Sequence, residues 1–372
     1  MTIVQRLQAK GIRRTGSPKK GFRYRLPGGG HPSAVDLERI DALKIPPAWT
    51  DVAIHTSRSA MVQAVGKDRA GRWQYHYHEA QTARREERKR ERLLRFIEAL
   101  PKARKAMRRD LALPGLPREK VLAGILRVLA TCFLRPGSEV YAAQNGTFGI
   151  ATLRRGHVTV TGDRIRFDFP GKSGKRQTQE IADRRLARLI RDLLRYPGEV
   201  FKFRSESGDL VDVRRQHINE YIKTTMGGRF SAKDFRTWAG SLLCACALAR
   251  GGAAPAASPT ERKRRIAAAI REVAHQLGNT PAVCRSSYVF PAVLQRFEEG
   301  RVLPHTLESV AALTEGGRIR VERCERALLR LLRESGSKGG AERKRRTVGA
   351  RRADEPDRSL DPPESGRVAV SG

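Results

Sequence analysis

The sequence is poor in acidic residues and contains no long apolar run. Its 372 residues include 39 Asp and Glu against 74 Lys and Arg, which leaves a formal net charge of +35 (74 − 39). The longest apolar stretch, residues 238–249, is interrupted by Gly240 and Ser241 and is shorter than the about 20 residues that span a bilayer. The first residues carry no apolar segment typical of a secretory signal peptide. We therefore expect no membrane span, no secretion and a cytoplasmic location.

Metal-binding motifs are also missing. None of the cysteines forms a Cys-x-x-Cys pair or has a histidine partner at the spacing of a zinc site. The prediction is therefore free, buried thiols in a reducing cytoplasm, and no metal site. The cysteines are Cys132, Cys244, Cys246, Cys284 and Cys324.

The excess of positive charge points to a polyanionic partner. A net charge of +35 far exceeds the magnitude of about 2–8 that keeps a small domain soluble. Self-repulsion of this size weakens a fold unless a polyanion offsets it. Lys and Arg bind phosphates with release of counterions, so DNA or RNA is the expected partner, in the nucleoid. An anionic membrane surface is less favoured, because the sequence has no lipid anchor or amphipathic insertion helix.

The pattern along the chain predicts an α+β protein with two domains and a tail. Residues 1–20 are basic and are predicted to be partly disordered. Up to residue 82, short apolar runs alternate with Pro- and Gly-rich turns, which indicates a small β-rich N-terminal domain. The alternation of Trp73, Tyr75 and Tyr77 predicts a strand with one aromatic face. Residues 335–372 are rich in Arg, Pro and Gly without periodicity and are predicted to be a disordered basic tail.

Residues 83–334 are predicted to form a mainly helical domain with one small sheet. The strongly basic segment 84–109 has an apolar stripe and is interpreted as two helices separated at Pro101. Alternating residues between 157 and 181 predict a hairpin and a third strand. Ser231 and Asp234 have the spacing of a capping box, which places Arg236 in the second turn of its helix. Further helices are predicted over 119–133, 183–196, 212–226, 232–249 and 260–277.

Five short segments contain side chains suited to phosphate chemistry. Arg135 lies just past a predicted helix, Lys172 lies in a Pro-Gly-Lys-Ser-Gly-Lys turn, and Arg236 lies near a helix start. Asn279 belongs to a Gly-Asn-Thr-Pro segment, and Tyr288 follows nine residues later. Each segment alone is a weak signal. In this order and spacing, residues 22–297 resemble the type IB DNA topoisomerases of the poxvirus and bacterial branch, and residues 146–153 are also similar to that family.

The resemblance implies an enzyme that relaxes supercoiled double-stranded DNA through a 3′-phosphotyrosyl intermediate, without ATP, a cofactor or an obligatory metal. Tyr288 would be the nucleophile, and Lys172 the general acid for the departing 5′ oxygen. Two guanidiniums, Arg135 and Arg236, can each donate paired hydrogen bonds to the nonbridging oxygens. Asn279 would add one further donor. No small-molecule substrate is expected, and the protein would act as a monomer that clamps DNA.

The resemblance also implies a set of DNA-binding residues. The N-terminal domain would lie over the major groove, where its tyrosines contact bases or backbone. The basic helix that follows is expected to contact phosphates. The candidates are Lys233, Tyr141, Tyr75, Tyr77, Arg84 and Arg85.

Several assignments have rivals in the sequence. Lys175 competes with Lys172 for the role of general acid, and the resemblance favours the first lysine after Pro-Gly. Tyr196 and Tyr221 are alternative nucleophiles, but neither follows a Gly-Asn-Thr-Pro segment. Viral members of the family carry histidine where this chain has asparagine. His275, one helical turn earlier, is a conceivable substitute that we interpret as a helix-surface residue.

Two other functions compete with the topoisomerase. A tyrosine recombinase shares the nucleophile, but Lys233 stands where a recombinase would carry the histidine of its His-x-x-Arg motif. Recombinases also have a helical N-terminal domain, whereas residues 22–78 are predicted to be β-rich. A non-enzymatic nucleoid protein would need only the charge.

Overall fold

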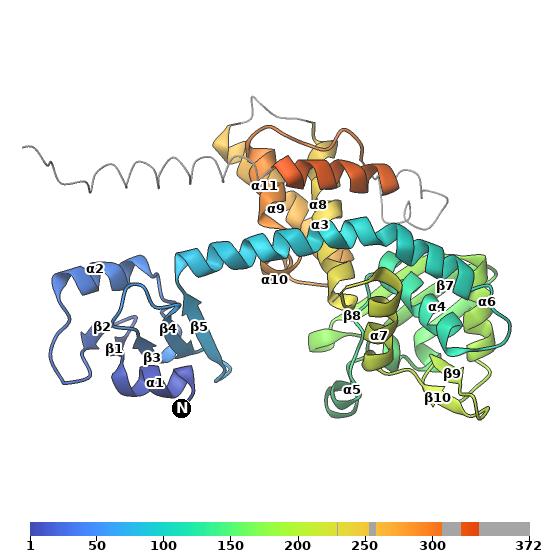
Figure 1. Cartoon of the computed structure of the whole chain (residues 1–372), viewed down its shortest axis with the longest axis horizontal. Coiled ribbons are helices and arrows are strands. Elements are labelled where there is room, and N and C mark those ends of the chain that lie inside the picture. Colours follow the sequence, from blue (N-terminus) through green and yellow to red (C-terminus); the bar gives the residue numbers. More distant parts are fainter. Residues whose placement is uncertain (229, 253–257, 307–320, 335–372) are drawn as a thin grey trace, which may run out of the picture. The chain divides into compact units, whose positions relative to one another are not determined.

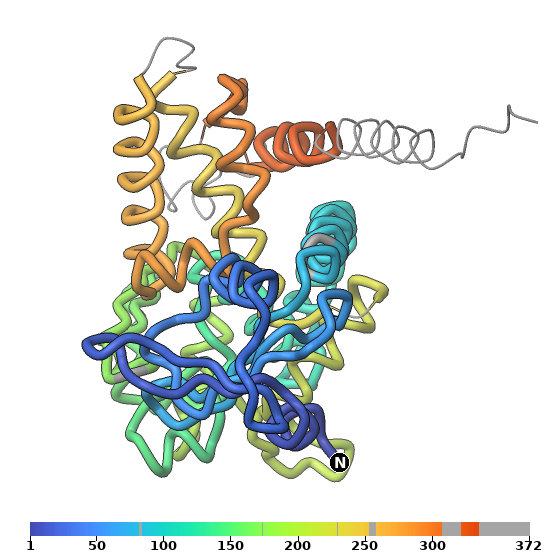
Figure 2. The backbone as a smooth tube through the Cα atoms, turned by 90° about the vertical axis from the view of Figure 1, so that its left-hand side faces the viewer, coloured from blue at the N-terminus to red at the C-terminus, as the bar shows by residue number. Residues whose placement is uncertain are grey.

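The computed structural model describes residues 1–228, 230–252, 258–306 and 321–334, and it divides the chain into two compact units (Figures 1 and 2). The first unit is Met1–Arg92 and the second begins at Leu93. The boundary therefore lies after residue 92 rather than after residue 82, where the sequence predicted it. The predicted basic tail, residues 335–372, lies outside the described residues. Helices and sheets are both present, which confirms the α+β prediction.

The first unit is built on a five-stranded antiparallel sheet in the order β2-β1-β3-β4-β5. Side chains alternate between the two faces of each strand, so the sheet has two small cores. Ala53 and Val65 pack against Val4 and Leu7 of helix α1, while Ile54 faces the core that includes helix α2. The β-rich prediction is thus confirmed. The elements are α1 (Ile3–Lys10), β1 (Ile12–Ser17), β2 (Gly21–Arg25), α2 (Ala34–Ala42), β3 (Thr50–Ile54), β4 (Val62–Lys67) and β5 (Trp73–Tyr77).

The expectation that residues 1–20 are irregular is wrong. Thr2 and Gln5 form a capping box at the start of α1, in which Thr2 Oγ1 accepts from the Gln5 N–H at 3.2 Å. Val4 and Leu7 are buried from this helix, and strand β1 follows it directly. A capped turn with two buried side chains supplies enough interactions to order a short basic segment.

Helix α3 (Glu79–Asp110) begins in the first unit and ends in the second. The prediction of two helices separated at Pro101 is wrong, because the helix continues through the proline. A proline inside a helix removes one hydrogen bond at a cost of about 3 kcal/mol. Leu93, Phe96 and Leu100 before the proline and Ala103 after it are all buried in one core. This continuous apolar face offsets the cost and keeps the helix in one piece.

The second unit combines helices with a three-stranded antiparallel sheet, β6-β7-β8, and a two-stranded sheet, β9-β10, which the sequence analysis missed. The hairpin and the third strand are confirmed, and so are the five helices predicted after residue 118. The elements up to the second sheet are α4 (Arg118–Thr131), α5 (Glu139–Asn145), η1 (Ile150–Thr152), η2 (Arg155–His157), β6 (Val158–Thr161), β7 (Arg164–Pro170), η3 (Lys172–Gly174), β8 (Arg176–Ala182), α6 (Arg184–Leu193), β9 (Lys202–Arg204) and β10 (Leu210–Asp212).

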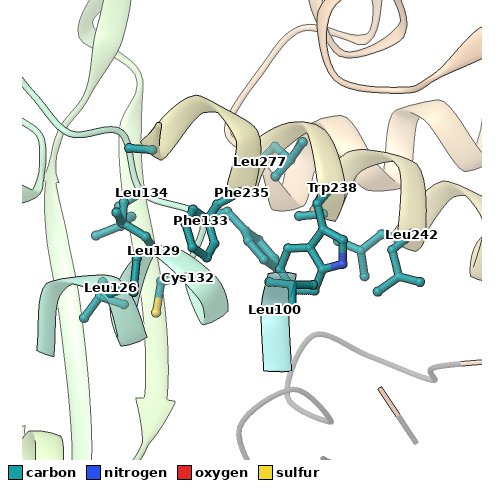
Figure 3. Close-up of a cluster of buried hydrophobic side chains, with 14 of the residues drawn as sticks. Leu100, Leu126, Leu129, Cys132, Phe133, Leu134, Phe235, Trp238, Leu242 and Leu277 are labelled. Carbon is teal, nitrogen blue, oxygen red and sulfur yellow. The ribbon is translucent and has the colours of Figure 1, made fainter. Parts of the chain in front are cut away.

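The remaining helices surround α8, which packs beside α9 and α11 (Figures 1 and 2). Phe133 at the end of α4 meets Phe235 and Trp238 of α8 in the core (Figure 3), and the Phe133 and Trp238 rings lie 6.3 Å apart. This packing fixes the start of α8 against the end of α4. These elements are α7 (Arg215–Met226), α8 (Ala232–Arg250), α9 (Pro259–Gln276), α10 (Pro281–Ser287) and α11 (Pro291–Glu298), followed by helical residues 321–334.

The five cysteines are free and buried, as the sequence predicted. Burial raises the pKa of Cys132 and Cys244 to about 12 and that of Cys284 to about 11. In the part of the chain that is described, no group of three or more His, Cys, Asp or Glu is placed to hold a metal ion. Within the same residues, no helix has both the length and the apolar character to cross a membrane.

Candidate active site

Arg236 is the buried centre of the candidate site. The Ser231 N–H and hydroxyl both donate to Asp234 Oδ2, at 2.8 and 2.9 Å, and start α8 just before the arginine. The Arg236 side chain is only 3% exposed. Its guanidinium donates to the Phe133 carbonyl and, at 2.7 Å, to the Leu277 carbonyl. A cation near a helix N-terminus interacts unfavourably with the helix dipole. The hydrogen bonds to the two carbonyls offset this cost, so the position of Arg236 is not explained by the stability of α8.

The turn that carries Arg135 is held by backbone contacts. Phe133 adopts a left-handed conformation with φ of 53°, which ends α4 and precedes Arg135. The Ile150 N–H donates to the Arg135 carbonyl at 2.9 Å. A Cβ at Gly149 would lie 2.4 Å from the backbone nitrogen of Gly137, so two glycines allow the two chain segments to touch. The segment 146–153 therefore fixes the backbone of Arg135.

The same segment reaches the turn that carries Lys172. The Phe148 N–H donates to the Pro170 carbonyl at 2.8 Å, just before this turn. The turn itself is closed by a bond from the Gly171 N–H to the Lys175 carbonyl at 2.8 Å. One short segment thus joins the backbones around Arg135 and Lys172, two residues that are far apart in the sequence.

Asn279 contacts Arg135 through its side-chain oxygen, and its amide nitrogen remains available as a hydrogen-bond donor. The Arg135 guanidinium donates to Asn279 Oδ1. The Asn279 Nδ2 group is buried without a hydrogen-bond partner among the described residues, and so is Arg236 Nε. Buried donors are nearly always paired in folded proteins. One unpaired donor on the Arg236 guanidinium and one on the Asn279 amide, with the Arg135 guanidinium bound to that amide, form a site that an anion would complete.

Tyr288 is held at the end of α10 with its ring near Arg236. Its N–H donates to the Cys284 carbonyl at 3.0 Å, and its carbonyl accepts from the buried Ser241 hydroxyl at 3.2 Å. A Cβ at Gly240 would lie 2.7 Å from the Tyr288 carbonyl oxygen, so α8 and the tyrosine backbone touch at this glycine. The Arg236 Cζ atom lies 4.7 Å from the centroid of the Tyr288 ring.

The surrounding cations change the acidity of the Tyr288 phenol. Burial alone would raise its pKa, because burial disfavours the phenolate. The charge of Arg236 and hydrogen bonding from it, with the charges of Arg135 and Lys233, more than offset this effect and lower the pKa of Tyr288 below its ordinary value. The same crowding acts on the cations, since burial and the nearby Arg236 lower the pKa of Arg135. The site therefore favours negative charge on the phenol oxygen.

The structure brings four of the five predicted catalytic residues into contact or close proximity. The Lys172 side chain is exposed and has no hydrogen bond or ion pair among the described residues. Lys172 is connected to the other four residues through the backbone hydrogen bonds of its turn. Lys175, its rival in the sequence, is equally exposed.

The rival tyrosines and His275 have other surroundings. Tyr221 is buried, and its hydroxyl donates to Asp110 at 2.7 Å. Burial and this carboxylate raise the pKa of Tyr221, so its phenol is a poor nucleophile. The Tyr196 hydroxyl accepts from Arg204 at 3.3 Å. His275 is exposed in the last turn of α9, as the sequence interpretation had it.

The predicted DNA-binding residues are accessible in both units. In the second unit, Tyr141 on α5 is 63% exposed and Lys233 on α8 is exposed. In the first unit, Tyr75 is 39% exposed. The Arg85 Cζ atom lies 4.0 Å from the centroid of the Tyr77 ring.

Arg84, next to this pair in the sequence, is also exposed. On Tyr77, one ring face is thus covered by a cation. Tyr75 and Arg84 are exposed, whereas Tyr77 is half-buried and also stacks against the ring of Tyr75.

Sequence reasoning missed three residues that support the site. Gly240 and Ser241 were noticed only because they interrupt an apolar run, although a small residue and a hydroxyl inside such a run often mark a close contact. Gln177 gave no signal, since a glutamine in a strand is ordinary. All three act through contacts between elements, which a single sequence does not reveal.

Comparisons with known proteins agree with this geometry. Residues 78–303 match the family described as "Eukaryotic DNA topoisomerase I, catalytic core", and residues 21–68 match "Bacterial DNA topoisomerase IB, N-terminal domain". The chain is 35% identical over 306 residues to DNA topoisomerase 1B of Acanthamoeba polyphaga mimivirus, which covers 80% of this chain and 90% of that protein. It is 25% identical over 276 residues to DNA topoisomerase I of Monkeypox virus and to DNA topoisomerase 1B of Vaccinia virus (strain Copenhagen), covering 72% of this chain and 83% of each relative.

By class, therefore, the protein is a DNA topoisomerase, an isomerase that acts on double-stranded DNA. It belongs to the type IB family, in the branch that contains the poxvirus and bacterial enzymes. This confirms the resemblance drawn from the five short segments. It also favours the topoisomerase over the recombinase and the non-enzymatic nucleoid protein.

Proposed function

We propose that Tyr288 is the nucleophile of this topoisomerase and that Arg135, Arg236, Asn279 and Lys172 assist it. The phenol oxygen attacks a backbone phosphorus, the bond to the 5′ oxygen breaks, and a 3′-phosphotyrosyl bond forms. The phenol proton passes to water as the bond forms, and the departing 5′ oxygen takes a proton from Lys172. Religation is the reverse. The new phosphodiester retains the energy of the old one, so strand rotation between the two steps relaxes supercoils without ATP.

The unpaired donors support the roles given to the arginines and the asparagine. In the five-coordinate transition state, negative charge grows on the two nonbridging oxygens. Arg236 Nε and Asn279 Nδ2 are buried donors without a partner in the described part of the chain, and Arg135 donates to Asn279 Oδ1. Preorganised donors of this kind are typically worth about 3–4 kcal/mol each in a transition state. This convergence is the observation that carries the proposal.

The lysine role rests on position and chemistry. Lys172 is the first residue of η3 in a turn that Phe148 joins to the backbone near Arg135. An exposed side chain can move toward the leaving oxygen when DNA binds, and an ammonium group within hydrogen-bond distance of that oxygen can donate a proton to it. Lys175 remains the alternative donor in the same turn.

We further propose that the protein acts as a monomer in the nucleoid and that both units contact the DNA. The exposed Tyr75, Arg84 and Arg85 would serve the first unit, and Tyr141 and Lys233 the second. The net charge of +35 supports binding through many phosphates, which makes affinity strongly dependent on salt.

The decisive test is the variant Tyr288→Phe, which removes one oxygen and little else. We expect it to abolish the covalent DNA adduct trapped by detergent and the relaxation of a supercoiled plasmid in EDTA without ATP. DNA affinity should stay close to that of the wild type, because Tyr288 contributes one hydroxyl to a surface with many cations. Peptide mapping of the wild-type adduct identifies the linked residue directly.

Tyr196→Phe is the matched control, because it makes the same chemical change at a tyrosine outside the site. It should retain both the adduct and relaxation. An adduct that persists in Tyr288→Phe, or a mapped link to another tyrosine, would reassign the nucleophile.

A further inference from the structure

Two turns that carry proposed catalytic residues lie on either side of one glutamine. Gln177 on β8 is 9% exposed and pairs across the sheet with Phe169. Gly171, directly before Lys172, lies on one side of its side chain, and Gly278, directly before Asn279, lies on the other. We propose that Gln177 is a positioning residue that sets the separation between the Lys172 turn and the Asn279 turn. This inference rests on the proposed roles of those two residues.

Built Cβ positions show how closely the glutamine fills this space. A Cβ at Gly171 would lie 2.5 Å from Gln177 Cγ, and a Cβ at Gly278 would lie 2.1 Å from Gln177 Oε1 and 2.5 Å from Nε2. Real Cβ contacts essentially never fall below 3.0 Å. The stem of the glutamine therefore touches one turn and its amide touches the other, with only a hydrogen atom of each glycine between them.

The φ angles of the two glycines show whether glycine is required by the backbone conformation or by the lack of room for a side chain. Gly278 has φ of +60°, so glycine is favoured there by backbone conformation as well as by the amide. Gly171 has φ of −95°, which any residue adopts. A side chain at Gly171 is therefore excluded by lack of space and not by its φ angle, since a Cβ would lie 2.5 Å from Gln177 Cγ and 3.2 Å from the Lys175 carbonyl oxygen.

Neighbouring contacts keep the glutamine in this place. Gln177 Nε2 faces the carbonyls of Arg176 at 3.2 Å and Lys175 at 3.4 Å, both in its own segment. Gln179, two residues further along the same face of the strand, donates from Nε2 to the Gln276 carbonyl at 3.2 Å. Strand β8 is thus joined to the end of α9, and Gln177 is the part of this contact that reaches the Lys172 turn.

Removal of the Gln177 side chain should impair proton donation by Lys172 more than it impairs the other proposed catalytic residues. The Asn279 turn has other supports, because the Leu277 carbonyl accepts from Arg236 and the Asn279 side chain accepts from Arg135. The Lys172 side chain has no partner among the described residues. The backbone of the Lys172 turn is closed by its own hydrogen bonds, but only packing positions the lysine side chain, so a gap at position 177 changes the placement of Lys172 more than that of Asn279. Misplacing a reacting group by about 1 Å can cost about 10²-fold in rate.

The experiment compares two substrates in single-turnover cleavage at saturating enzyme. One is an ordinary duplex, and the other carries sulfur in place of the 5′ bridging oxygen at the cleavage site. A thiolate leaves readily because a thiol has a pKa of about 8.5, so its departure needs little help from a general acid. The variants are Gln177→Ala and Gln177→Met. Thr178→Ala is the matched control, since the exposed Thr178 lies on the opposite face of the same strand.

We expect Gln177→Ala to cleave the ordinary duplex about 10- to 100-fold more slowly than the wild type, and the sulfur substrate at close to the wild-type rate. Gln177→Met fills a similar volume and should recover most of the loss. Thr178→Ala should leave both rates unchanged. A merely structural role would slow both substrates alike.

Equal losses on the two substrates, or no loss in Gln177→Ala, would overturn the assignment of Gln177 and leave the proposed function standing. A wild-type protein that cleaves neither substrate would instead refute the proposed function, and this inference with it.

Discussion

Gly240→Ala tests whether contact between α8 and Tyr288 sets the rate of strand cleavage. A Cβ at this position would lie 2.7 Å from the Tyr288 carbonyl oxygen and 2.9 Å from the Tyr288 Cβ. Ordinary van der Waals contact begins at 3.4 Å, so the tyrosine backbone and the helix must separate by roughly 0.7 Å (3.4 − 2.7). Both neighbours are fixed atoms near the backbone and not the end of a flexible side chain. The added methyl group therefore displaces Tyr288, the proposed nucleophile.

The size of the effect follows from this displacement. A shift of about 1 Å in a reacting group can cost about 10²-fold, so a somewhat smaller shift is expected to slow cleavage by about 10- to 100-fold. The shift also separates the Tyr288 carbonyl from the Ser241 hydroxyl, which donates to it at 3.2 Å. Helix propensity works the other way, because Gly→Ala inside a helix favours the helix by about 0.5–1 kcal/mol. Loss of activity with a stable helix would therefore isolate the contact.

The assay is single-turnover formation of the covalent adduct, measured beside DNA affinity and the midpoint of thermal unfolding. Gly156→Ala is the matched control, since a Cβ at Gly156 would meet nothing within 4 Å. The control should cleave like the wild type. The reasoning would be refuted if Gly240→Ala cleaved at the wild-type rate, or if its loss of cleavage were explained by a matching loss of folded protein.

Two further predictions concern tyrosine chemistry. Tyr221→Phe should retain the covalent adduct but lower the free energy of unfolding by about 1–3 kcal/mol in chemical denaturation. The reason is that Asp110, which is 2% exposed, loses the hydroxyl that donates to it. Loss of the adduct at unchanged stability would contradict this prediction. The cleavage rate should rise with pH as Tyr288 ionises, with a midpoint below the ordinary tyrosine pKa of about 10, because Arg236 and Arg135 lower the pKa of Tyr288. Arg236→Ala removes the foremost of these charges and should shift the midpoint upward in a pH–rate profile; an unmoved midpoint would show that another group titrates.

Most of the second unit could be predicted from local patterns. Alternation predicted the three strands of the β6-β7-β8 sheet, and the Ser231–Asp234 spacing predicted the start of α8. These features depend on residues that are close in the sequence, so their signals are local. The order of five chemically suited side chains also predicted the family, because catalysis requires those residue types whatever surrounds them.

The predictions that were wrong, and the residues that were missed, depend on tertiary contacts rather than on local sequence patterns. Pro101 predicted a break in α3, but burial on both sides of the proline outweighs one lost hydrogen bond. The basic character of residues 1–20 predicted disorder, although two buried side chains and a capping box order the segment. Gln177 touches Gly278, about 100 residues away, as well as the nearby Gly171, and Gly240 touches Tyr288, about 50 residues away. Secondary-structure propensity and amino-acid composition carry no information about such long-range packing.

The pairing of Arg135 with Asn279 shows what an amide contributes at this position. The Asn279 side-chain oxygen accepts from the Arg135 guanidinium, while the amide nitrogen is buried and has no acceptor within the residues that the structure describes. A protonated imidazole has two donors and no acceptor, so it would face the arginine as a like charge. A neutral imidazole could accept from the arginine and still donate, but it titrates near pH 6.5. In the proposed mechanism, the asparagine amide joins Arg135 to a phosphate oxygen and does not change its charge with pH, so the pH dependence of cleavage is carried by other groups, Tyr288 among them.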